Sequence, residues 1–102
     1  MRAEPKFTVG AAADVARGAE HYNAQRPNLG YEFLEEVERI TAHIREAPLL
    51  STLVDPPIRR VLLRRFPYGM FYVAGGSDEP DVVVAVMDLR QHPDVIRKAY
   101  QR

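Results

Sequence analysis

A run of six apolar residues, Val82 to Met87, constrains the fold of this 102-residue chain more than any other feature. The run is far shorter than the ~20 residues that a membrane-spanning helix needs. It has no polar alternation, which is typical of a strand that is buried on both of its faces. We therefore predict a central β-strand over Asp81–Asp88.

The segments before this run predict two helices. Four apolar residues follow the helical spacing i, i+4, i+7, i+11 and form one face of a helix that Pro48 ends: Phe33, Val37, Ile40 and Ile44. An earlier alanine-rich stretch repeats small or apolar residues at helical spacing and ends before Pro27: Ala12, Val15, Ala19 and Tyr22. The short connection between them indicates an antiparallel hairpin, and we expect the stripe of the second helix to face the sheet.

The remaining segments complete an α+β fold. Further strands are predicted at Lys6–Val9, Ile58–Arg65 and Met70–Ala74, with a loop over Leu49–Pro57. The order β-α-α-β-β-β places a helix hairpin on a small, mainly antiparallel sheet, within one domain over residues 1–102. Pro93–Arg102 could add a short C-terminal helix, with Pro93 in its first turn.

The composition excludes several kinds of site. The chain has no cysteine, so disulfides, thiolate metal sites and cysteine nucleophiles are excluded, and a reducing cytoplasm is the expected location. The charged, proline-containing start Met1–Gly10 does not resemble a signal peptide, and no association with a membrane is expected. His21 and His43 have no partner at ligand spacing, and Ser51 and Ser77 lack the context of a nucleophile. We expect neither a metal nor another cofactor.

A net charge of zero hides an uneven distribution. Tyr31–Ala47 carries five glutamates against two arginines, whereas Ile58–Arg65 carries four arginines and no acid. Such a basic segment can meet phosphates or an acidic partner, or it can form a solvated strand face.

Four stretches of the sequence together resemble the RelE/ParE toxin family of type II toxin–antitoxin and plasmid stabilisation systems. The most specific is Leu63-Arg64-Arg65-Phe66-Pro67-Tyr68-Gly69-Met70-Phe71-Tyr72, preceded by Ile58-Arg59-Arg60. The others are the alanine-rich helix Ala11–Tyr22, the segment from Phe33 to Pro48, and Val83–Pro93, where an apolar strand ends in a polar, basic segment. The resemblance spans almost the whole chain. It implies a bacterial, cytoplasmic toxin that a cognate antitoxin neutralises.

The resemblance also implies two kinds of target. Some members cut messenger RNA in the ribosome with a set of cationic residues, and others inhibit DNA gyrase and lack that set. The matching candidates for a nuclease here are Arg60, Arg64, Arg90 and His92. Gly69 stands where nuclease members carry an arginine, and Gln91 lies near another basic position. These departures favour a ParE-like toxin.

Three functions therefore stay open. The first is a ParE-like toxin acting on a protein such as DNA gyrase. The second is a RelE-like ribosome-dependent endoribonuclease, and the third is a decayed member that only binds a partner, so whether the chain is an enzyme is undecided. We expect an extended C-terminal segment of the cognate antitoxin to cover the arginine-bearing strand or the helix hairpin. Its acidic residues should meet arginines of the basic segment: Arg59, Arg60, Arg64 or Arg65. For Tyr68 and Tyr72 packing is favoured over base stacking.

Overall fold

The computed structural model describes residues 2–102 and contains eight helices and strands. In chain order they are β1 (Lys6–Phe7), α1 (Val9–Gln25), α2 (Leu29–Glu46), β2 (Thr52–Asp55), β3 (Ile58–Leu62), β4 (Tyr68–Val73), β5 (Val82–Asp88) and α3 (Pro93–Tyr100).

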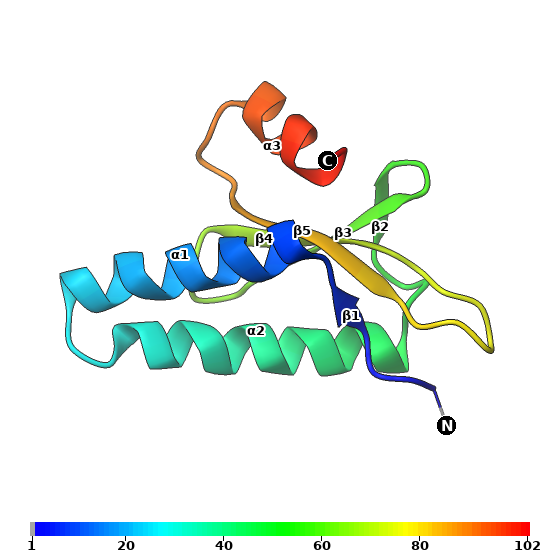
Figure 1. The fold of residues 1–102 in the computed structure, drawn as a ribbon, viewed down its shortest axis with the longest axis horizontal. Helices are drawn as coiled ribbons and strands as arrows, with labels where there is room; N and C mark the ends of the chain where they lie inside the picture. The colour runs from blue at the N-terminus through cyan, green and yellow to red at the C-terminus, as the bar shows by residue number, and fades with distance from the viewer. Residues whose placement is uncertain (1) are drawn as a thin grey trace.

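The strands form one sheet in the order β1-β5-β4-β3-β2. β5 lies inside this sheet, pairing in parallel with β1 and antiparallel with β4. The central strand predicted from the apolar run Val82 to Met87 is confirmed. The α1–α2 hairpin lies on one side of the sheet and α3 on the other (Figure 1). The predicted α+β fold, mainly antiparallel with a helix hairpin, is thus confirmed.

The hairpin side contains the larger core. The four stripe residues of α2 are all buried within it, together with Met70 and Tyr72 of β4 and Val83 and Val86 of β5. The predicted orientation of this stripe is therefore confirmed. Glycines allow α1 and α2 to approach closely, because a Cβ on Gly18 would lie 2.7 Å from the Phe33 ring. A Cβ on Gly30 would lie 2.5 Å from the carbonyl oxygen of Ala19.

The short C-terminal helix forms and covers the opposite face of the sheet. Ala99 is buried there with Ile58, Phe71 and Ala85. The Tyr100 ring stacks on Phe71 with a centroid distance of 5.1 Å. Cover on both faces explains why the β5 run lacks polar alternation.

Several predicted segments differ from the structure. The predicted strand Lys6–Val9 ends at Phe7 because Thr8 caps α1, which begins at Val9, and the predicted strand Met70–Ala74 runs from Tyr68 to Val73. The expected loop Leu49–Pro57 contains the edge strand β2, whose side chains show no apolar alternation because none of them is fully buried. The predicted strand Ile58–Arg65 ends at Leu62, and the backbone N–H groups of Arg64 and Arg65 donate to the carboxylate of Glu36. On α1, Ala12 is exposed, and the buried face consists of Ala11, Asp14, Gly18 and Tyr22.

Candidate functional site

The arginines of β3 and of the following loop are the predicted site, and the structure distributes them over two faces of the sheet. Arg59 lies on the strand next to β2, where its Nη1 donates to the carbonyl oxygens of Leu49 (3.2 Å) and Ser51 (2.8 Å). These two hydrogen bonds hold the segment that leads into β2. Arg59 therefore serves the fold, although its side chain is only half-buried.

Arg60 lies on the α3 side of the sheet, in a hollow of about 310 Å³ that also includes Gln91, Arg97 and Tyr100. Its Nε is buried and has no hydrogen-bond partner within residues 2–102. Gly69 makes room for the arginine stem, because a Cβ at that position would lie 3.3 Å from Cγ of Arg60. A buried N–H without an acceptor is uncommon in a native fold, and Nε of Arg60 is a donor that the described residues leave unused.

Arg64 and Arg65 follow the end of β3 on the α2 side. Both backbone N–H groups donate to the carboxylate of Glu36, which is 1% exposed. The side chain of Arg65 pairs with Glu32 at 2.5 Å and lies over the Phe66 ring. The charge of Arg65 is therefore already paired with an acid of α2. The side chain of Arg64 lines a separate hollow between α2 and β3.

Arg90 and His92 lie in the turn between β5 and α3. The guanidinium of Arg90 donates to both carboxylate oxygens of Asp88, at 3.0 and 2.7 Å. Nδ1 of His92 accepts the backbone N–H of Asp94 at 3.0 Å and so caps the start of α3. Both side chains have local roles at the ends of β5 and α3.

The four nuclease candidates do not line a common hollow. Arg60 lies in the hollow under α3, and Arg64 lies in the one beside α2. Gln91 accompanies Arg60, whereas Arg90 is paired and His92 caps a helix. A phosphoryl-transfer site needs its cations aimed at the same reacting group, and this arrangement does not provide that.

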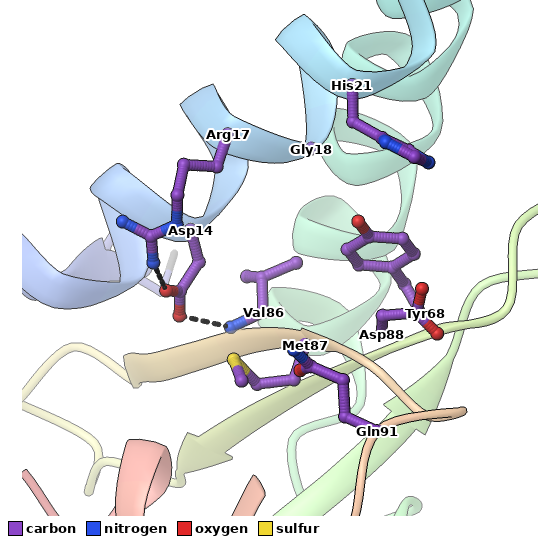
Figure 2. A pocket seen from close by; sticks show the side chains of 9 residues that line it. All are labelled: Asp14, Arg17, Gly18, His21, Tyr68, Val86, Met87, Asp88 and Gln91. Carbon is purple, nitrogen blue, oxygen red and sulfur yellow. Dashed lines mark hydrogen bonds and ion pairs between the residues drawn. The ribbon is translucent and has the colours of Figure 1, made fainter. Parts of the chain in front are cut away.

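A further polar hollow of about 330 Å³ lies between α1 and the ends of β4 and β5 (Figure 2). His21 of α1 lies opposite Tyr68 across it, whereas the guanidinium of Arg17 turns to Asp14 (Figure 2). Tyr68 is only 8% exposed and packs against the Phe33 ring at a centroid distance of 4.9 Å, and burial raises its pKa. Tyr72 is fully buried, and its hydroxyl donates to the carbonyl oxygen of Pro48 at 2.7 Å. Both tyrosines therefore pack in the core, as the favoured interpretation predicts.

Asp88 provides a test of the turn geometry. The hydrogen-bonded guanidinium of Arg90 holds the pKa of the Asp88 carboxyl below its ordinary value, and partial burial opposes this effect. Since the folded pKa is lowered, this pair stabilises the fold above the ordinary carboxyl range and stops doing so as the pH falls through the folded value.

We expect Arg90→Ala to raise the pKa of Asp88, measured by NMR titration of the carboxyl carbon. Arg97→Ala, which removes a partner of Asp94 instead, should leave the titration unchanged, and an equal shift in both variants would contradict the assignment.

Two acids that position the hollows were not predicted from the sequence. Asp14 is 3% exposed and accepts the backbone N–H of Val86 at 3.0 Å, beyond the point where β1 stops pairing with β5. Arg17 and Arg102 pair with the same carboxylate. The i, i+3, i+7, i+11 spacing of Ala11, Asp14, Gly18 and Tyr22 could have revealed this face. Nothing local in the sequence distinguishes the second acid, Glu36, from the other glutamates of α2.

The described residues contain neither a metal-binding cluster nor a membrane-spanning helix. Within residues 2–102 no three histidine or acidic side chains lie together as a metal site requires. No helix in that range has the length and apolar character to cross a membrane.

The fold has a counterpart among solved structures. The structure described as "Chromosomal ParDE TA system from P. aeruginosa" contains a chain that matches with a TM-score of 0.60, over 83% of this chain and 94% of that chain. The chain shares its fold with part of a ParDE system. The two sequences are 19% identical, so the likeness concerns the fold. No protein-family model and no curated protein matches the sequence.

Proposed function

We propose that this protein is the toxin of a type II toxin–antitoxin system, neutralised by a cognate antitoxin. The observation that carries the proposal is the fold shared with a chain of a ParDE system, covering 83% of the present chain. The resemblance of the Leu63–Tyr72 segment to RelE/ParE toxins supports it independently, because it rests on sequence. The proposal takes the protein to be bacterial and cytoplasmic, as the resemblance to RelE/ParE toxins implies.

Among the two kinds of target, the geometry favours a ParE-like toxin that acts on a protein such as DNA gyrase. Arg60 and Arg64 lie in different hollows, and Arg90 is held by Asp88. Losing one donor that stabilises a transition state typically costs ~100-fold or more in rate. A RelE-like endoribonuclease remains the alternative, with Arg60, Arg64, Arg90 and His92 as its residues, and a member that only binds a partner is the third.

The antitoxin is proposed to cover basic side chains of the Ile58–Arg65 segment. Arg60 and Arg64 have the most to offer an acidic partner, because neither forms an ion pair within residues 2–102. Arg59 and Arg65 already bind backbone carbonyls and Glu32, respectively, so a partner would have to compete for them. A cognate complex that leaves all four arginines exposed to solvent would contradict this assignment.

The test is to induce the chain alone in a bacterial host and then together with the product of the reading frame beside its gene. We expect growth to stop in the first case and to continue in the second. Purified chain should inhibit supercoiling by DNA gyrase, and transcripts from the induced cells should show no new ends in phase with codons. The double variant Arg60→Ala, Arg64→Ala is the control for cleavage.

Each other outcome points to a different function. Codon-phased cuts that disappear in the double variant would establish the nuclease alternative. If growth stops but transcripts show no codon-phased cuts and gyrase still supercoils DNA, both named targets would be excluded. Normal growth during induction, with the folded chain present, would leave only the member that binds a partner.

A further inference from the structure

A hollow of about 310 Å³ lies between α3 and the sheet, on the face opposite the α1–α2 hairpin (Figure 1). On α3, the residues that line it follow the spacing i, i+3, i+4, i+7 and so share one side of the helix: Pro93, Ile96, Arg97 and Tyr100. On the sheet, Arg60 of β3 lies directly opposite Phe71 of β4, so both side chains leave the same face. The volume is at the lower end of the range for small-molecule sites.

The lining of this hollow is mainly apolar. Phe71 is 2% exposed, and the Tyr100 ring stacks on it with a centroid distance of 5.1 Å. Val54, Leu89 and Ile96 add half-buried aliphatic side chains. Two aromatic rings beside aliphatic walls suit a ligand with a flat, apolar body.

Arg60 brings a positive charge into this apolar lining. The residue is half-buried, and its Nε reaches neither solvent nor a hydrogen-bond partner within residues 2–102. Its guanidinium forms no ion pair in that range. Because arginine stays protonated in proteins, this charge is held partly away from water without a counter-charge, which costs free energy. A bound anion would supply the missing counter-charge.

The other polar side chains of the hollow are paired or neutral. Arg97 pairs with Asp94, and the hydroxyl of Tyr100 donates to the carboxylate of Asp55 at 3.0 Å. Gln91 is neutral and exposed. The lining therefore has one unbalanced positive charge, which a single negative charge would match. A carboxylate carries one such charge at neutral pH, whereas a phosphate monoester carries nearly two and would lose more hydration against apolar walls.

We infer that this hollow binds a small organic monocarboxylate whose apolar body is about the size of one ring. The carboxylate pairs with the guanidinium of Arg60, and the body lies among Phe71, Ile96 and Tyr100. Such a ligand would occupy Arg60 but leave Arg64, in the hollow beside α2, to the proposed antitoxin. The inference goes beyond the toxin–antitoxin proposal and does not depend on it, because it rests on the lining and the charge of this hollow.

The experiment follows backbone amide shifts of the isotope-labelled full chain while phenylacetate is added. We expect saturable binding, with the largest shifts at Phe71, Leu89 and Ile96. Arg60→Met removes the charge and keeps an unbranched side chain, so it should weaken binding about tenfold or more. Lys98→Met removes the same charge from the exposed surface of α3 and should leave the affinity unchanged.

Phenylacetamide tests the charge without any change in the protein, because it has nearly the same shape as phenylacetate and is neutral. We expect it to bind about tenfold more weakly or less. Inorganic phosphate and adenosine monophosphate should also bind more weakly than phenylacetate, since the walls are apolar. The melting temperature of the chain should rise with phenylacetate and stay nearly constant with the amide.

Four results would overturn the inference. They are the absence of shifts at millimolar phenylacetate, shifts confined to another surface, equal affinity for the amide, and tighter binding of either phosphate compound at the same residues. Equal affinity for the amide would leave an apolar pocket in which Arg60 has no role, and tighter binding of phosphate would make it a site for another class of ligand. The growth assay stays separate from this test. Growth arrest without phenylacetate binding would refute the carboxylate site and leave the toxin proposal standing, whereas binding without arrest would do the reverse.

Discussion

Replacing Phe33 by alanine is expected to lower the free energy of unfolding by about 3–5 kcal/mol. Phe33 is fully buried, and its ring lies edge-on against Phe66 and Tyr68 at centroid distances of 5.3 and 4.9 Å. The gap would be hard to close, because Gly18 has no side chain that could move into it. For a domain of this size that loss is a large part of the total stability.

Urea denaturation of the purified variant measures this effect. Leu34→Ala is the matched control, since Leu34 is the next residue on α2 and is 39% exposed. We expect the control to lose clearly less stability than Phe33→Ala. Equal losses in the two variants would show that Phe33 does not hold the α1–α2 hairpin on the sheet.

Removing the carboxylate of Glu36 should cost about 2–4 kcal/mol, because it leaves two backbone donors without their acceptor. Glu36 accepts from the N–H groups of Arg64 and Arg65, and its side chain is almost completely buried. The predicted change is Glu36→Ala. Glu36→Gln keeps one carbonyl acceptor in nearly the same volume and should lose less.

Two measurements separate this effect from a general loss of packing. Urea denaturation gives the free energy of unfolding, and hydrogen exchange reports the amides of Arg64 and Arg65 individually. In Glu36→Ala both amides should exchange faster even where the core stays protected. Unchanged exchange at these amides would contradict the role of Glu36, and Glu35→Ala, on the exposed neighbour, is the control.

The geometry of Glu36 links stability to the proposed partner surface. The carboxylate binds the backbone after Leu62, where the chain turns and Arg64 lines the hollow between α2 and β3. A partial loss of this anchor should therefore also displace Arg64, one of the arginines that we propose the antitoxin covers. The surface that we propose for a partner depends on a buried acid on the facing helix.

The sequence by itself determined the elements whose pattern is local. The stripe of Phe33, Val37, Ile40 and Ile44 shows its helix and its buried face, because side chains four residues apart lie on one side of a helix. The apolar run of β5 shows a strand covered on both faces for a similar reason. Pro93 correctly indicated the start of α3.

Only the tertiary structure decided which polar groups meet. β2 is a strand because β3 supplies its hydrogen bonds, and its own side chains carry no apolar pattern. The family resemblance places Arg60 and Arg64 in one set of candidate residues, yet they line different hollows. The turn after Leu62, which Glu36 of a distant helix stabilises, separates them. Hydrogen bonds between segments far apart in the chain leave no periodic trace in it, so the arrangement of the candidate site follows from the packed fold.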